Sequence, residues 1–216
     1  NTAYLASSQA FSGAGAQMVP TLSPVLVTQM IGSTSLAGIG SSITGLSRFL
    51  ISYPIGKLTD RFGRKAGVIL GLILVGSGAS ITGISAVLNT FPLFLIGMLI
   101  MGLGTGAVQQ LRVAAADMYP PNRRAEGLGL VLTGSLIGAV ISPILLKISE
   151  VFAGQLGLEP IALAWFFIPV AVILSVFMVL KVNPDPKVIA SNLSEYYPDY
   201  VNPNTLQTRS GNVSIL

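Results

Sequence analysis

The chain contains no cysteine and no histidine in its 216 residues, and only 9% of its residues are charged. The absence of cysteine excludes disulfide bonds and thiolate metal sites. The absence of histidine removes the commonest metal ligand and the commonest general base. Paired acids, a nucleophile beside a base and clusters of metal-binding side chains are also missing from the sequence. We therefore expect no catalytic residues, no metal site and no cofactor, and we expect that the protein is not an enzyme.

The few charged residues are also unevenly spread along the chain. No charge occurs between residues 1 and 47, and the next charged residue after Lys65 is Arg112. A soluble protein with buried helices would need amphipathic partner helices with charged outer faces, and the sequence has none. The hydrophobic fraction of 51%, without the alternating segments of a membrane barrel, favours membrane-spanning helices. The predicted fold class is therefore an all-α membrane protein.

Breaks at glycine, proline and asparagine divide the apolar runs into segments of about 20 residues, the length that a spanning helix needs. Six helices are expected, near residues 4–28, 33–56, 66–87, 91–114, 126–147 and 161–181. Residues 1–181 are thus predicted to form a six-helix transmembrane bundle. The segment 182–216 is rich in Asn, Pro and Ser, and is predicted to be a cytoplasmic linker or tail that is partly disordered.

The basic residues predict the orientation of this bundle, because short loops rich in Lys and Arg stay on the cytoplasmic side. With the amino terminus inside, ten of the twelve basic residues lie on that side: Lys57, Arg61, Arg64, Lys65, Arg112, Arg123, Arg124, Lys181, Lys187 and Arg209. Both termini are therefore expected to be cytoplasmic, in a multi-pass protein of the cell (plasma or inner) membrane. Basic residues beside membrane spans contact membrane lipid head groups, so we expect lipid rather than nucleic acid as their partner.

A short turn between the second and third expected helices crowds one carboxylate among several cations. An ordinary cytoplasmic loop would explain its basic residues, but not Asp60 and the two glycines at this spacing. Gly56 permits close approach of another helix, and Gly63 permits a backbone conformation that other residues resist. The residues that carry the pattern are Gly56, Lys57, Asp60, Arg61, Gly63, Arg64 and Lys65.

This turn resembles the signature of the major facilitator superfamily, in which a glycine and three residues precede Asp-Arg, any residue, Gly and two basic residues. The resemblance implies the amino-terminal six-helix half of a transporter, built as two inverted three-helix repeats. It also implies a cytoplasmic gate, in which Asp60 interacts with a helix end of the opposite half and with an arginine near the end of the fourth helix. Arg112 is the candidate for that arginine.

The loop between the fourth and fifth expected helices is similar to a second family element. Asp117, Pro120 and Arg124 keep the family spacing, whereas Ala125 replaces a glycine. On the resemblance, Asp117 and Arg124 are therefore counted with the gating motif. The chain, which begins at Asn rather than Met, is expected to be a fragment whose partner is the missing carboxyl-terminal six-helix half of the same transporter.

The function that the resemblance implies is secondary active transport of a small-molecule substrate by alternating access, with an antiporter or efflux type as one form of it. The alternative is a membrane sensor or scaffold that keeps the fold without transporting. An arginine that many proton-coupled members carry in the fourth helix is replaced, since Met98 and Met101 occupy its region. No carboxylate or histidine lies in the middle of an expected helix, so coupling is expected to use the other half.

The fifth expected helix matches a glycine-rich antiporter pattern only in part. Gly129, Gly138 and Pro143 fall at matching spacings, while Ser142, Leu146 and Lys147 depart from the pattern. The alternative is that Gly134 and Gly138 let two helices pack closely, and this interpretation is favoured.

Four polar residues are candidates for a substrate cavity. Arg48 is the only charge well inside an expected helix, and it either faces the cavity, favouring a carboxylate or phosphate, or extends its side chain to the cytoplasmic interface. Gln9, Ser12 and Gln17, with Ser8, share one broad face of the first helix at helical spacing. Cavity lining is the favoured interpretation of that face, and packing against neighbouring helices is the alternative.

Overall fold

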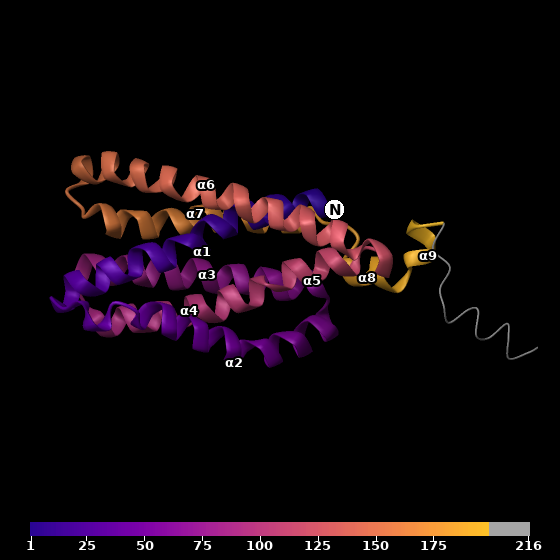
Figure 1. Ribbon diagram of the computed structural model, residues 1–216, viewed down its shortest axis with the longest axis horizontal. Coiled ribbons are helices and arrows are strands. Elements are labelled where there is room, and N and C mark those ends of the chain that lie inside the picture. The colour runs from indigo at the N-terminus through magenta and orange to yellow at the C-terminus, as the bar shows by residue number, and fades with distance from the viewer. Residues whose placement is uncertain (199–216) are drawn as a thin grey trace, which may run out of the picture.

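The computed structural model describes residues 1–198, and the regular structure of this part is helical. Figure 1 shows the long helices running side by side along the long axis of the molecule. Two single turns, η1 (Thr34–Leu36) and η2 (Pro121–Arg123), lie between them. The helices are α1 (Thr2–Ile31), α2 (Ile39–Phe62), α3 (Arg64–Leu88), α4 (Phe91–Val108), α5 (Gln110–Asp117), α6 (Arg124–Leu156), α7 (Pro160–Leu180), α8 (Pro186–Ser191) and α9 (Leu193–Tyr196).

The helix ends follow from residues that tolerate a left-handed backbone. Gly32, Asn89 and Gly157 have φ values of 73°, 50° and 64°, and they end α1, α3 and α6 at one end of the bundle. At the opposite end Gly63 has φ 94° and separates α2 from α3. The turns at 32–38, 89–90 and 157–159 therefore share one end, and Gly63, η2 and α8 share the other (Figure 1).

Within residues 1–198, four segments are long and apolar enough to cross a membrane: Arg64–Leu88, Phe91–Asp117, Pro121–Leu156 and Pro160–Leu180. Helices α1 and α2 have sufficient length, but polar side chains lower their hydropathy. The all-helical fold agrees with the prediction, whereas the count of six spanning helices stays a prediction. Many outer side chains are apolar and exposed, including Phe49 at 77%, Val140 at 67% and Ile173 at 67%. Such a surface suits lipid rather than water.

Two of the six expected segments differ from the observed helices in an informative way. The second, expected at 33–56, begins at Ile39 and ends at Phe62, because residues 34–36 form a separate turn and the helix continues through Pro54 and Gly56 as far as Gly63. The fourth, expected at 91–114, is interrupted at Gln109, where α4 ends and α5 begins. The first difference places Arg48 nearer the middle of its helix.

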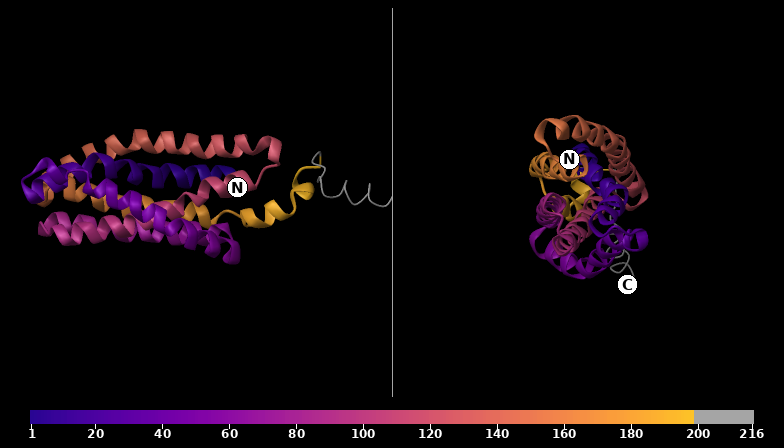
Figure 2. Two further views of the ribbon diagram at one scale, coloured as in Figure 1. Left: turned by 60° about the horizontal axis from the view of Figure 1, so that its bottom comes forward. Right: turned by 90° about the vertical axis from the view of Figure 1, so that its left-hand side faces the viewer.

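Helix packing places the first three long helices against the last three. Helix α1 packs on α6 and α7, α2 packs on α4, and α3 packs on α4 and α7. The end-on view in Figure 2 shows α6 and α7 grouped with α1 on one side of the bundle, and α2 and α4 on the other. If α1 is exchanged with α4, α2 with α6 and α3 with α7, most of these helix pairs are found again. Two three-helix repeats would produce this symmetry. Their inverted relation stays a prediction.

Glycines let the helix backbones touch. A Cβ atom on Gly138 would lie 2.5 Å from the carbonyl oxygen of Ala10, and one on Gly134 would collide with the carbonyl oxygen of Ala6. The helix-packing interpretation of this glycine pair is therefore confirmed. Gly78 of α3 meets the backbone of α4 in the same way, with a Cβ 2.5 Å from the amide nitrogen of Met101.

The first part of the expected tail is packed on the bundle. Helices α8 and α9 form within residues 182–198, and Val182 and Ile189 are only 1% and 6% exposed. The predicted disorder of the remaining tail concerns residues 199–216, which lie outside the described part of the chain. The division into a bundle at 1–181 and a tail at 182–216 stays a prediction.

Candidate functional site

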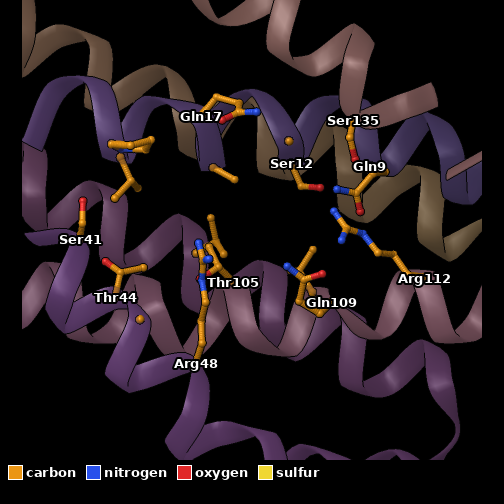
Figure 3. Close-up of a pocket in the computed structure, with 17 residues that line it drawn as sticks. Gln9, Ser12, Gln17, Ser41, Thr44, Arg48, Thr105, Gln109, Arg112 and Ser135 are labelled. Carbon is orange, nitrogen blue, oxygen red and sulfur yellow. The ribbon is translucent and has the colours of Figure 1, made fainter. Parts of the chain in front are cut away.

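A polar cavity of about 330 Å³ opens between helices near the middle of the bundle. Its walls come from α1, α2, α4, α5 and Gln109 between the last two, with Ser135 from α6 and Val75 as the one lining residue from α3. Figure 3 shows the polar side chains converging on this space from opposite sides. They are Gln9, Ser12, Gln17, Ser41, Thr44, Arg48, Thr105, Gln109, Arg112 and Ser135.

The polar face of α1 divides between the cavity and a helix contact. Gln9, Ser12 and Gln17 line the cavity, as expected for cavity-lining residues. Ser8 lies instead against α7, where its hydroxyl is 2.6 Å from the hydroxyl of Ser175. Cavity lining therefore applies to Gln9, Ser12 and Gln17, and helix packing applies to Ser8. Contact of the three cavity residues with a substrate stays a prediction.

Arg48 extends into the cavity from α2. The α4 backbone comes close because Gly102 and Gly106 lack side chains, and a Cβ on Gly106 would lie 3.1 Å from the Cα of Arg48. The Arg48 Nε atom donates a hydrogen bond to the Thr105 hydroxyl at 3.0 Å. Since α2 runs to Phe62, Arg48 is the tenth of its 24 residues and lies near mid-helix. The structure thus places Arg48 in the cavity rather than at the cytoplasmic interface; its role there stays a prediction.

Arg112 also faces the cavity, on the same helix face as Thr105, Val108 and Gln109. Its backbone N–H donates to the Gln109 carbonyl at 3.1 Å, a three-residue spacing that tightens the turn. Figure 3 shows the guanidinium pointing toward Gln9. Its Nε atom is buried and has no hydrogen-bond partner among the described residues.

The pairing expected between Arg112 and Asp60 is therefore not present in this structure. Arg112 and Thr105 were not expected from the sequence to be cavity residues. Arg112 was expected on the loop side, because the fourth helix was expected to end at 114. The available signal in the sequence was the spacing of Arg112, which follows Thr105 by seven residues, or about two helical turns, on a glycine-rich helix.

The charge of the cavity is one-sided. Two arginines line it, and no carboxylate of residues 1–198 does. Charges in a partly desolvated cavity interact more strongly than in water, and a guanidinium fits carboxylate or phosphate oxygens with two parallel hydrogen bonds. The lining amides and hydroxyls add neutral donors and acceptors. Chemically, the cavity can hold a small polar anion.

A second cluster lies at the turn between α2 and α3, where Arg64 joins the two family-like elements. Its Nε donates to Asp117 Oδ2 at 3.1 Å, and its Nη1 is 3.5 Å from Asp60 Oδ1. Nη1 also donates to the Thr59 hydroxyl at 3.1 Å. The Asp60 side chain is 74% exposed and that of Asp117 is 24% exposed. The partner of Asp60 in this chain is thus Arg64, with Asp117 as the better-buried acceptor.

Asp185, which follows α7, completes this cluster. Its carboxylate oxygens accept the backbone N–H groups of Arg64 and Lys65 at 3.2 and 3.1 Å, so they cap the start of α3. The Lys65 ammonium donates to the carbonyls of Leu180 and Val182 at 2.7 and 3.1 Å, at the end of α7. Asp185 was not expected from the sequence: its place directly before Pro186 is typical of a cap for α8, where it accepts the Lys187 N–H at 2.8 Å, and does not indicate the contact with α3.

The remaining residues of the expected gating motif lie at the same end of the bundle. Arg61 and Arg124 are exposed. No atom of residues 1–198 lies within 4 Å of a Cβ placed on Gly56, so this part of the chain does not make the close approach expected there. Gly63 has φ 94°, and a Cβ on it would lie 2.7 Å from Asp185 Oδ2.

Solved structures share the fold of this chain. The xylose transporter XylE from E. coli, in an inward open conformation, aligns with a TM-score of 0.67 and 14% identity, over 99% of this chain and 56% of that chain. The major facilitator transporter FucP, in the outward conformation, aligns with a TM-score of 0.65 and 22% identity, over 84% of this chain and 50% of that chain.

Curated relatives agree with this fold. The uncharacterized MFS-type transporter YdeG of Bacillus subtilis (strain 168) is 30% identical over 187 residues, covering 86% of this chain and 44% of YdeG. The multidrug resistance protein MdtG of Escherichia coli (strain K12 / DH10B) is 30% identical over 178 residues, covering 78% of this chain and 40% of MdtG. The chain thus spans less than half the length of these relatives. Residues 5–207 match the family described as the Major Facilitator Superfamily. This chain belongs to the major facilitator superfamily of membrane transporters.

Proposed function

We propose that this chain forms the amino-terminal half of a secondary active transporter that moves a small solute by alternating access. The observation that carries the proposal is the polar cavity beside Arg48, near the middle of a bundle with an apolar outer surface. Intramembrane ionisable residues that face a water-filled space mark substrate pathways by default. In secondary transporters the substrate site lies near the bilayer midplane, between two rocking units.

A second six-helix half completes the proposed transporter. Helices α3 and α7 contribute little or nothing to the cavity, so the polar walls face away from them. The bundle is about equally similar to half of XylE, solved inward open, and to half of FucP, solved in the outward conformation, with TM-scores of 0.67 and 0.65. This supports a half that keeps its internal packing while it rocks. The relatives named multidrug resistance proteins suggest efflux as the direction.

The cluster around Arg64 is proposed as the cytoplasmic gate. Asp60 remains largely exposed in this chain, at 74%, and is thus available to a helix end of the second half. A carboxylate beside a helix amino terminus contributes about 0.3–2 kcal/mol, which shifts a balanced equilibrium up to about thirtyfold toward the closed state on that side. A membrane sensor or scaffold with the same fold would not need a polar cavity at mid-helix.

Cysteine accessibility tests alternating access in the full-length protein. Gln17 lines the cavity and is exposed, and this chain has no cysteine to interfere. We expect Gln17→Cys, in a full-length background without other cysteines, to react with a membrane-impermeant maleimide from either side of the membrane. A cavity that opens alternately to both sides gives this result. Labelling is measured in right-side-out and inside-out vesicles.

Ser175→Cys is the matched control. Ser175 is fully buried between α7 and α1, where its hydroxyl donates to the Ser8 carbonyl at 2.9 Å. It should stay unlabelled from both sides. Reaction of Gln17→Cys from one side only would contradict alternating access and would favour the sensor or scaffold.

A further inference from the structure

We propose that Arg48 and Arg112 together form an anion-binding site, and that the solute carries a carboxylate, phosphonate or phosphate group held by both guanidinium groups. The inference rests on the proposed function and deepens it by assigning the chemical class of the solute. It also gives Arg112 a binding role in place of the gating role that the sequence suggested.

The two guanidinium groups converge on one space. Arg48 comes from α2 and Arg112 from α5, and both line the same cavity. Figure 3 shows the two groups directed into the space from different helices. Arg48 bonds Thr105, and Thr105 precedes Arg112 by seven residues, which corresponds to about 10 Å of helix. Both guanidinium groups border the same cavity of about 330 Å³, and the proposal places one small anion between them.

Their hydrogen-bond donors are only partly used. Arg48 uses Nε for the Thr105 hydroxyl, a neutral acceptor. Arg112 Nε is buried without an acceptor among the described residues. A buried donor that lacks a partner is strongly unfavourable, more so on a charged group. A ligand oxygen supplies the missing acceptor.

The arginines at the cytoplasmic end provide a contrast. Arg64 contacts Asp117 and Asp60, and Arg123 contacts Glu126 at 2.7 Å. The cavity arginines have no such carboxylate within residues 1–198. Uncompensated charge in a membrane protein is expensive and marks function. Guanidinium rather than ammonium at both positions favours an oxyanion with two coplanar acceptors.

The neutral lining defines the rest of the solute. Gln9 and Ser12 are only 8% and 5% exposed and face the same space as Arg112. The Gln9 amide can donate to or accept from polar groups next to the anion, and the Ser12 hydroxyl, which donates to the Ser8 carbonyl at 2.9 Å, can accept from them. A cavity of about 330 Å³ suits a small organic acid rather than a large lipophilic cation.

Thermal stability of the purified full-length transporter, in detergent with neutral lipid, tests the site. The probes are benzoate, phenylphosphonate and inorganic phosphate, and the matched neutral compounds are benzamide and dimethyl phenylphosphonate. A ligand that binds only the folded protein raises Tm with concentration. We expect the organic acids to raise Tm and the neutral compounds to leave it unchanged.

Three substitutions in the cavity and one control outside it identify the residues. Arg48→Gln and Arg112→Gln should each weaken the apparent affinity for the acids by about tenfold or more, the effect expected from one charge-assisted contact. Arg48→Lys should keep part of the affinity. Lys147→Gln removes the same charge from an exposed position outside the cavity and should behave as the wild type.

The outcomes separate the possible sources of the anion. No Tm increase with any acid, or an equal increase with the neutral compounds or in both Gln variants, overturns the inference. The same holds if phosphatidylglycerol raises Tm through the two arginines while soluble acids do not, because the anion is then a lipid. A third outcome is a large loss of Tm in both Gln variants without ligand, together with no effect of the acids on the wild type. The two arginines would then pair with carboxylates of the second half, and the inference would again be overturned.

Failure of this inference is distinguishable from failure of the proposed function. If acids do not bind but Gln17→Cys is labelled from both sides, transport stands and only the solute class is wrong. If acids bind through both arginines but labelling is one-sided, the site stands and alternating access is wrong.

Discussion

Arg64 and Arg48 show how differently the charges of two arginines in one bundle are compensated by their neighbours. Arg64 has two carboxylates within 3.1 and 3.5 Å and a hydroxyl at 3.1 Å. Arg48 bonds the neutral Thr105 hydroxyl inside the cavity. The first arrangement stabilises a turn, and the second leaves charge available to a ligand. The chemistry of each guanidinium is thus set by its neighbours.

The two ion pairs of Arg64 should differ in strength. Double-mutant cycles with Arg64→Gln, Asp117→Asn and Asp60→Asn, followed by thermal unfolding of the full-length protein, measure each pair. We expect the Arg64–Asp117 coupling to exceed about 1 kcal/mol, because both side chains are mostly buried and the geometry is short. The Arg64–Asp60 coupling should be roughly 0–1 kcal/mol, since Asp60 is 74% exposed.

The exposed pair Arg123–Glu126 provides a reference for a surface contact, at 49% and 51% side-chain exposure. Its coupling should resemble that of Arg64–Asp60. A coupling of Arg64–Asp117 no larger than this reference would show that burial of the pair adds no stability.

Among the helices, α6 shows how one residue type serves two roles. Gly138 touches the α1 backbone, whereas a Cβ placed on Gly129 would have no atom of the described residues within 4 Å and would face open space. Glycine spacing along α6 predicted a packing contact, and the structure shows which glycine makes it. The position of α1, and therefore of Gln9 and Ser12, depends on that contact.

A bulky residue at the α1 contact should disturb the bundle. We expect Gly138→Leu to destabilise the full-length protein by about 2 kcal/mol or more, because overpacking of a tight contact typically costs about 1–3 kcal/mol and here the obstacle is backbone. Gly129→Leu, on the same helix and in open space, should change stability by less than about 0.5 kcal/mol.

The two variants are compared by thermal unfolding in detergent and by the yield of monodisperse protein. Equal yields and equal Tm values would mean that α1 and α6 are not packed through Gly138. Because the same residue change is made twice on one helix, altered helix propensity cannot account for a difference.

The whole bundle has two ends of different charge. The α3–α4 turn, which contains Asn89, lies at the end with the α1–α2 and α6–α7 turns, and the α5–α6 connection, which contains Arg123, lies at the end with α8 (Figure 1). The basic residues gather at the second end, which predicts that this end is cytoplasmic. Both termini of the six-helix unit would then lie inside.

Single-cysteine labelling measures this topology. We expect a cysteine at Asn89 to react with an impermeant reagent only from outside, and a cysteine at Arg123 only from inside. Reaction at Asn89 only from the cytoplasmic face would reverse the orientation. Lys147→Gln, on the outer half of α6, is a suitable background control because it removes a basic residue without changing the inner count.

Local composition was enough to determine several features of this protein. The scarcity of charge determined the membrane class, since helix hydropathy depends on neighbouring residues alone. The Gly-rich breaks determined the approximate helix positions, and the turn from Gly56 to Lys65 determined the family resemblance. Gln9, Ser12, Gln17 and Arg48 were found because polar residues on an apolar helix stand out.

Only the tertiary structure decided where those residues point and what they contact. Arg112 lines the cavity together with Thr105 and Gln109 because helix packing turns this face of α4 and α5 toward α1, which no hydropathy pattern marks. Arg64 meets Asp117 across 53 residues, and its N–H meets Asp185 across 121. Such contacts depend on how the helices are rotated and how closely their backbones approach, and both are set by packing between segments that are distant in the sequence.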